Sequence, residues 1–171
     1  MAHAKAYQHH PTATYAPAFT MRGATEAALR YLAPRLTRGS LNEMDALSRF
    51  QPISVLLSEM DKKVVIADIT SPDKPIAVLD VTVSPNGTDT YLWAARTEKG
   101  VQLDWALTSY VSAVLNGFQV AHPTLVSPVD ARNIEHIAWL KCVGFEHSEY
   151  LPQYGRKELP FVILKRTKTN V

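Results

Sequence analysis

The chain has 171 residues, of which 46% are hydrophobic and 20% charged, and its formal net charge is +2. This length suits one domain with a buried core, and this composition excludes an intrinsically disordered chain. So small a charge gives no strong sign of a nucleic-acid partner, because binding a phosphate backbone needs a concentrated basic face. No apolar run reaches the roughly 18 residues that can span a bilayer, so we expect a protein kept in the cytoplasm.

The first part of the chain predicts an arm followed by helices. Residues 1–21 show no apolar periodicity and no acidic residue, so we expect an extended N-terminal arm. Its neighbouring His9 and His10 are expected to be solvated, and we expect no metal site. Residues 22–62 predict a helical lead-in, in which Ser40 is a candidate cap with Glu43 three residues later. The expected helices lie within 25–36, 40–50 and 52–60.

From Lys63 the pattern becomes that of a sheet. Three β-branched runs separated by turn residues predict an antiparallel meander. Apolar residues at spacings of three and four after Gly100 predict a long helix. A strand broken by Pro128, a helix from Asp130 to its stop at Gly144, and two further strands follow. The expected elements are strands 64–69, 76–83 and 90–95, a helix over 103–118, a strand over 124–127, a helix over 130–143, and strands over 145–151 and 161–165.

The element order and the last helix resemble the GNAT (N-acetyltransferase) superfamily. In that family a helix begins near an Asn and ends in Gly-Phe before a strand, as Asn133, Gly144 and Phe145 do here. The resemblance implies an α/β fold in residues 22–171, with 63–171 forming a mixed, twisted and mainly antiparallel sheet. It also implies a central parallel strand pair that splays apart and helices on both faces. We expect Asn133 in the first helical turn and a positive φ at Gly144.

A narrower resemblance is to the GNAT-like internal virion proteins of short-tailed bacteriophages. It rests on the pattern Asn-x-x-His-Ile-x-aromatic-Leu-Lys, which runs here from Asn133 to Lys141, and on the helical lead-in. This resemblance implies a virion-associated protein that is made in the host cytoplasm and uses the fold as a docking scaffold. Its partners would be other virion proteins, with residues 1–21 as the candidate contact, and it would form an oligomer within the assembly.

The GNAT resemblance also implies a site for acyl-CoA. The family holds the pyrophosphate on backbone N–H groups of a turn with the pattern Arg or Gln, two residues, Gly, one residue, Gly or Ala. The matching turn, Thr97–Gln102, keeps only Gly100 of the two small residues. Glu98 adds a negative charge, and Gln102 places a long side chain where the phosphate would approach. The candidate cofactor-binding residues are Arg96, Lys99, Gly100, Val101, Gln102 and Asn133.

The catalytic groups that the resemblance implies are incomplete. The family commonly uses a Tyr seven residues after the motif Asn to protonate the thiolate, and this position is Leu140, which has no proton to give. Asp80 and Asp68 are candidate general bases, because an apolar strand would raise a carboxyl pKa, although either can face solvent or a turn. His136 is a further candidate that can line the cleft between the splayed strands or pack with its ring hydrogen-bonded.

Two functions follow from these observations. The degenerate turn and the missing Tyr favour the virion scaffold, which ranks first. The fold alone favours the alternative, an acyl-CoA-dependent N-acyltransferase that acts on an amine of a host protein or small molecule. We expect no cofactor for the scaffold and acetyl-CoA for the enzyme. Because Gln102 or Glu98 would obstruct the turn, we expect acetyl-CoA binding to be weak or absent, with a dissociation constant of about 1 mM.

Overall fold

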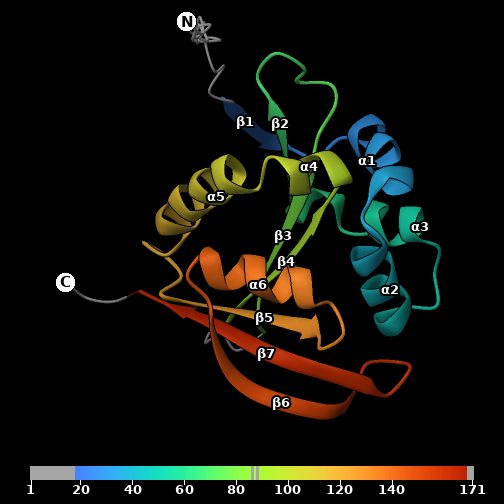
Figure 1. The fold of residues 1–171 in the computed structure, drawn as a ribbon, viewed down its shortest axis with the longest axis vertical. Helices are drawn as coiled ribbons and strands as arrows, with labels where there is room; N and C mark the ends of the chain where they lie inside the picture. Colours follow the sequence, from blue (N-terminus) through green and yellow to red (C-terminus); the bar gives the residue numbers. More distant parts are fainter. Residues whose placement is uncertain (1–17, 86, 88, 169–171) are drawn as a thin grey trace, which may run out of the picture.

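One twisted sheet organises the chain. A computed structural model describes residues 18–85, 87 and 89–168, and these residues form seven strands of a single sheet (Figure 1). The strand order is β1-β2-β3-β4-β5-β7-β6, and every neighbouring pair is antiparallel except β4 with β5. The strands are β1 Phe19–Gly23, β2 Lys63–Asp68, β3 Ala77–Val83, β4 Thr90–Arg96, β5 Thr124–Asp130, β6 Glu146–Tyr154 and β7 Leu159–Thr167.

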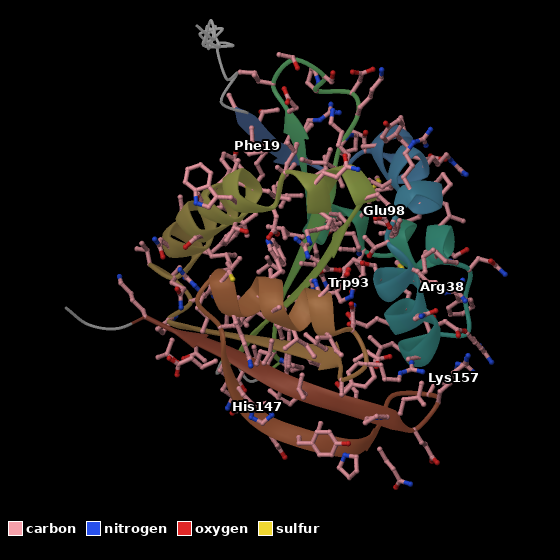
Figure 2. The ribbon with its side chains drawn as sticks, viewed as in Figure 1. Phe19, Arg38, Trp93, Glu98, His147 and Lys157 are labelled. Carbon is pink, nitrogen blue, oxygen red and sulfur yellow. The ribbon has the colours of Figure 1, made fainter. Side chains whose placement is uncertain are left out.

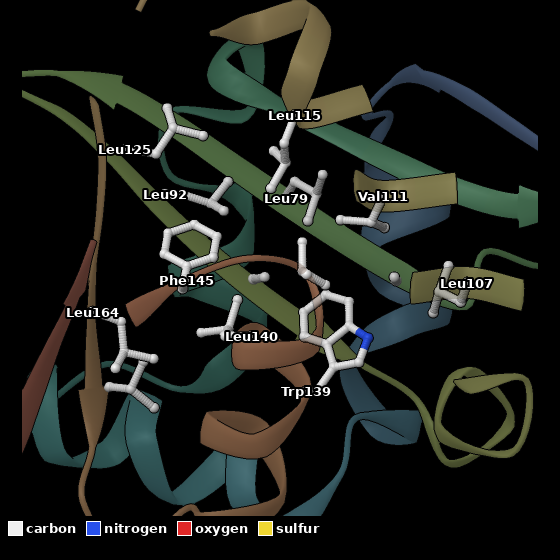
Figure 3. Packing of buried hydrophobic residues seen from close by; sticks show 14 of the residues in the cluster. Leu79, Leu92, Leu107, Val111, Leu115, Leu125, Trp139, Leu140, Phe145 and Leu164 are labelled. Carbon is white, nitrogen blue, oxygen red and sulfur yellow. The ribbon is translucent and has the colours of Figure 1, made fainter. Parts of the chain in front are cut away.

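Helices cover both faces of the sheet, because side chains of the central strands alternate between two cores. Leu79 and Leu92 pack with α5 and α6 in one cluster, which Figure 3 shows from close by. Val65 and Val78 pack with the N-terminal helices in the other cluster. The helices are α1 Glu26–Leu32, α2 Arg38–Leu47, α3 Pro52–Leu57, α4 Glu98–Gln102, α5 Asp104–Phe118 and α6 Ile134–Cys142, with 3₁₀ turns at Ala33–Arg35 and Met60–Lys62.

The N-terminal arm ends earlier than the sequence indicated. β1 begins at Phe19 and pairs antiparallel with β2, with Phe19 opposite Asp68. Residues 19–21, which were expected in the arm, therefore belong to the sheet. The cause is tertiary, since β2 offers a free edge that this short segment completes. Of the remainder of the expected arm, Ala18 is described and residues 1–17 lie outside the described residues.

The expected parallel pair is confirmed, and it splays. β4 and β5 keep only two register pairs, Thr90 with Leu125 and Tyr91 with Val126. β5 does not stop at Pro128 as expected but continues to Asp130. The amide of Asp130 points toward the gap, so the nitrogen of Pro128, two residues earlier on the same strand, faces the same side. None of the described strands pairs with β5 there, so the missing N–H of this proline costs no ladder hydrogen bond.

The end of the motif helix is as predicted, and its start differs in detail. Gly144 has φ +103°, and the amides of Gly144 and Phe145 donate to the carbonyls of Lys141 and Leu140, which is a Schellman ending. Asn133 is the residue that precedes the first turn. Asp130 was expected to cap this helix but instead ends β5.

The lead-in helix α2 is capped by a different residue from the one expected. Its cap is Thr37, whose hydroxyl accepts a hydrogen bond from the amide of Ser40 at 3.3 Å. Ser40, the expected cap, lies one turn inside the helix, so Glu43 falls in its middle rather than at its start. This position turns Glu43 toward the sheet, where it is 1% exposed.

Candidate functional site

A carboxylate occupies the gap where β4 and β5 separate. Glu43, carried by α2, accepts a hydrogen bond at Oε1 from the indole N–H of Trp93 on β4, at 3.1 Å. Its Oε2 accepts from the amide of Asp130 on β5, also at 3.1 Å. The side chain of Asn133 gives a third hydrogen bond. Figure 2 labels Trp93 on β4, beside α2. One side chain from the lead-in therefore bridges the two splayed strands.

Glu43 is tuned to take up a proton near neutral pH. Burial raises the pKa of Glu43 from 4.5 to about 7, because a low-dielectric setting disfavours the charged form. The three hydrogen bonds described above favour the carboxylate and oppose this shift, and the charge of Asp130 adds to it. A carboxyl with a pKa of about 7 exchanges protons readily at the pH at which amines must be deprotonated for attack.

Little in the sequence identifies Glu43 as a site residue. Its spacing from Ser40 suggested only a capping role, and its three hydrogen-bond partners lie 50 to 90 positions further along the chain. One sequence feature could have indicated its burial. Glu43 lies next to Met44 and about one helical turn from Leu47, and a charged side chain is rare on the side of a helix that faces the core.

On the other side of the sheet Arg96, Trp139 and His136 form a buried cluster. The guanidinium of Arg96 lies 4.2 Å from the centre of the Trp139 ring and donates to Asp104 at 2.9 Å. His136 stacks on Trp139 at 5.6 Å between ring centres. Burial and the neighbouring Arg96 lower the pKa of His136 to about 3. A ring that stays neutral at neutral pH is a poor proton carrier, which favours packing over catalysis.

The turn after β4 uses its central amides internally. The amide of Gly100 donates to the Thr97 hydroxyl at 3.1 Å, and that of Val101 donates to the Thr97 carbonyl at 3.0 Å. A Cβ on Gly100 would lie 2.6 Å from the Ile76 carbonyl oxygen, so close packing already requires a glycine there. The other residues of the turn, Glu98, Lys99 and Gln102, are exposed.

The two aspartates named as candidate bases lie in different settings. Asp80 on β3 accepts from Lys63 Nζ at 2.8 Å and from the Thr82 hydroxyl at 3.2 Å. Asp68 at the end of β2 accepts from the amide and the hydroxyl of Thr70 at 2.9 and 2.6 Å, which is the geometry of a turn. Of the two, Asp80 lines a pocket.

This pocket has a volume of about 270 Å³ and lies between α2, α3 and the sheet. Its walls are mainly apolar and aromatic, and the Lys63–Asp80 ion pair lines it as well. Trp93 belongs to both the pocket wall and the Glu43 network. Its lining is Met44, Leu47, Ser48, Val55, Ser58, Glu59, Lys63, Asp80, Tyr91, Leu92, Trp93, Pro128 and Tyr154.

The structure thus divides the predicted site residues into three groups. Arg96 and His136 meet through Trp139, and Asn133 joins the Glu43 network. Asp80 lies on the face that carries α2 and α3, where its register partner on β4 is Trp93 of the Glu43 network. Among the described residues no three His, Cys, Asp or Glu side chains are placed to hold a metal ion. None of the described helices is long and apolar enough to cross a membrane.

Comparison with known proteins relates this architecture to acetyltransferases. No family model matches the chain, and no curated protein matches it in sequence. A chimera of the spermidine N-acetyltransferase SpeG from Vibrio cholerae and hSSAT is 13% identical, with a TM-score of 0.63 over 87% of this chain and 95% of that chain. The ribosomal-protein-alanine N-acetyltransferase from Brucella melitensis is 15% identical, with a TM-score of 0.63 over 87% and 99% of the two chains.

A third solved structure, that of yncA from Salmonella typhimurium with its cofactor acetyl-CoA, is 12% identical. Its TM-score is 0.61, over 90% of this chain and 95% of that chain. Identities this low carry the fold and leave the chemistry open. The chain therefore has the mixed α/β fold of the GNAT acetyltransferases.

Proposed function

We propose that the chain is an acyl-CoA-dependent N-acyltransferase that acts on an amine. The observation that carries this proposal is the position of Glu43, a carboxyl with a pKa of about 7 in the gap between β4 and β5. The likeness to N-acetyltransferases supports the acyltransferase alternative over the virion scaffold, for which the three structures compared above give no support. A fold shared with acetyltransferases and a proton acceptor at its splayed pair point the same way.

In the proposed reaction Glu43 acts as the general base. An amine attacks a carbonyl carbon only with a free lone pair, so its proton must leave as the new C–N bond forms. Glu43 receives this proton, and its ionised form is held ready by Trp93, Asp130 and Asn133. Bound acyl-CoA supplies an activated acyl group as a thioester. The thiolate that leaves takes its proton from solvent, because Leu140 stands where the family commonly has a Tyr.

The residues near the β4 turn fit an acyl-CoA in part. Arg96, at the end of β4, and the exposed Lys99 supply two positive charges that suit a pyrophosphate, although the Arg96 guanidinium is already paired with Asp104 at 2.9 Å. The amides of Gly100 and Val101 do not contribute, because Thr97 accepts both. This combination predicts a weaker hold on acyl-CoA than a turn with bare amides would give.

A docking scaffold is the second candidate, and one observation favours it. A turn whose amides are occupied and whose glycine is needed for packing against Ile76 has no need of a phosphate. In this proposal Glu43 would only hold β4 and β5 at a fixed separation. The virion partners and the contact through residues 1–21 belong to this second proposal.

Steady-state release of CoA thiol in the presence of an amine separates the two proposals. We expect Glu43→Gln to lower kcat by about 100-fold or more, the usual contribution of a general base, and to remove an acid limb near pH 7. Glu149→Gln, at an exposed position on β6, is the matched control and should leave kcat unchanged. Equal rates for Glu43→Gln and the wild type would remove Glu43 from the chemistry. No amine-dependent thiol release by the wild type would favour the scaffold.

A further inference from the structure

The 270 Å³ pocket lined by Asp80, Trp93 and Val55 has a composition that selects its ligand. We propose that it is the acceptor site and that it takes a small primary amine, as the ammonium cation, carried on an aromatic or aliphatic body. The name acceptor site rests on the proposed function, whereas the binding of such an amine does not.

The walls specify an apolar body of limited size. Met44, Leu47 and Val55 come from α2 and α3, and Leu92 and Trp93 come from β4. Ligand pockets commonly hold about 300–1,000 Å³, so this pocket suits a ligand at the small end of that range. Apolar and aromatic side chains on opposite walls favour a ring or a short alkyl chain between them.

The polar groups specify a donor rather than an acceptor. Lys63 is the only cation among the described residues that line the pocket, and its three N–H groups are used. They point to the Ser58 carbonyl at 2.5 Å, the Glu59 carbonyl at 3.4 Å and Asp80 at 2.8 Å. No lining cation is therefore left to meet a carboxylate or phosphate on a ligand, which disfavours an anion.

Asp80 retains acceptor positions for an ammonium group. An ionised carboxylate offers about four acceptor positions, and Lys63 and Thr82 take one each. The Asp80 side chain is 19% exposed, so a ligand in the pocket can reach it. Glu59, the other acidic lining residue, is exposed and paired with Lys62 at 2.5 Å. One cationic head near Asp80 is thus matched, while further ammonium groups would have to be taken from water into a mainly apolar pocket in which Asp80 is the only carboxylate not in an exposed ion pair among the described lining residues.

The pocket adjoins the proposed base through a shared wall. Asp80 and Trp93 are register partners on β3 and β4, and the indole N–H of Trp93 donates to Glu43 at 3.1 Å. The strand that forms the floor of the pocket is therefore the strand that splays from β5. This continuity places a bound amine next to the gap that the proposed reaction uses.

Calorimetric titration of the full chain tests the pocket, with 2-phenylethylamine as the probe. We expect one site with a dissociation constant of about 1 mM or tighter. The uncharged analogue 2-phenylethanol should bind about tenfold more weakly, since it lacks the charge that Asp80 meets. Spermidine, with several ammonium groups, should also bind more weakly. Tighter binding of 3-phenylpropanoate, the anionic analogue, would overturn the proposal.

Two variants make the test specific to this pocket. Asp80→Asn should weaken binding of the amine about tenfold, and Asp73→Asn, in the exposed β2–β3 turn, is the matched control. Because Asp80→Asn leaves buried Lys63 without its anion and can impair folding, Val55→Trp provides a second variant that fills the pocket and keeps the ion pair. Amine binding that survives Val55→Trp in the folded protein would overturn the proposal.

The pocket and the proposed function fail in different ways. If Val55→Trp abolishes amine binding but the wild type transfers no acyl group to any amine, the pocket proposal stands and the acyltransferase proposal is wrong. If wild type and Val55→Trp acetylate an amine with the same kcat/KM, the acyltransferase proposal stands and the pocket is not its acceptor site.

Discussion

Trp93 and Glu43 are joined by a 3.1 Å hydrogen bond from the indole N–H to a carboxylate oxygen, and this bond ties β4 to α2 on the open side of the splayed pair. The other oxygen of Glu43 accepts from the amide of Asp130 on β5. Where the two strands stop pairing with each other, a side chain from the lead-in thus bridges them by accepting one side-chain N–H from β4 and one backbone N–H from β5. The same carboxyl has the pKa that a base needs near neutral pH. Glu43 therefore both links the two strands and serves as the general base in the proposed reaction.

The stability of the protein should fall as pH rises through the pKa of Glu43. The folded pKa of about 7 exceeds the ordinary 4.5, so the folded state binds this proton more tightly than the unfolded state does. The contribution is fully present below pH 4.5 and is lost as pH rises past 7, an effect of about 3 kcal/mol. Urea unfolding at pH 5 and pH 8 measures it. Glu43→Gln should lack the change and Glu149→Gln should keep it; equal pH dependence in both would contradict the assignment.

His136 should act in the opposite direction. Burial lowers its pKa from 6.5 to about 3, so its contribution is present above pH 6.5 and is lost as pH falls toward 3, by up to roughly 5 kcal/mol. Between pH 4.5 and 6.5 the protonation of Glu43 adds stability as pH falls and so masks the loss caused by His136. The measurement is therefore best made in the Glu43→Gln background. There we expect His136→Phe to reduce the loss of stability between pH 6.5 and 4.5, while His147→Phe on exposed β6 does not. If the free energy of unfolding of His136→Phe falls with pH as much as that of its parent, the His136 ring is not held in its neutral form by burial.

Arg166 should be a strong contributor to stability through two helix ends. It is 9% exposed and forms no ion pair among the described residues. Its guanidinium donates to the Val143 carbonyl at the end of α6 and to Asn116 and Gln119 at the end of α5, where Figure 1 shows these ends beside β7. Helix C-termini carry partial negative charge, which balances the cation.

Replacement of Arg166 by Met should lower the free energy of unfolding by about 3 kcal/mol, since several buried acceptors lose their donor. Lys165→Met, at the exposed neighbouring position of β7, should change it by less than about 0.5 kcal/mol. Chemical denaturation of the two variants side by side provides the comparison. A loss for Arg166→Met as small as that for Lys165→Met would show that the helix ends do not depend on it.

Gly100 should be required by packing even without a ligand. A Cβ there would lie 2.6 Å from the Ile76 carbonyl oxygen, so Gly100→Ala should destabilise the protein by about 1–3 kcal/mol. Gly117→Ala in α5 is the control, because nothing lies within 4 Å of its Cβ position, and it should stabilise by up to about 1 kcal/mol. Thermal unfolding distinguishes the two substitutions. Equal midpoints for Gly100→Ala and the wild type would refute the steric requirement.

Much of the fold after Lys63 could be predicted from local sequence patterns. Apolar residues repeat every two positions in strands and every three to four positions in helices. The helix over 103–118 matches α5 Asp104–Phe118, and the meander matches β2 to β4. β1 could not be predicted, since its five residues become a strand only against the free edge of β2. Pro128 suggested a strand end, and only the splay of β4 explains why β5 continues through it.

Less of the candidate site could be predicted. The family motif placed Gly144 correctly, because its backbone role depends on local spacing, whereas Asn133 precedes the first helical turn in which it was expected. Glu43 could not be identified as a site residue from the sequence. Its hydrogen bond to Asp130 spans 87 positions, and only the packing of α2 against the sheet brings the two residues together. Gly100 was interpreted as a remnant of a phosphate turn, but its contact with Ile76 supplies a packing reason that a sequence cannot show.

Calorimetric titration with acetyl-CoA tests most directly whether the splayed pair serves an acyl donor. We predict one site with a dissociation constant of about 0.1–1 mM, weaker than a micromolar site because Thr97 occupies the amides of Gly100 and Val101. Arg96→Met should weaken binding further, because Arg96 supplies the buried charge beside the gap. The absence of binding heat at about 5 mM acetyl-CoA, five times the weakest constant predicted, would contradict the acyltransferase and leave the scaffold.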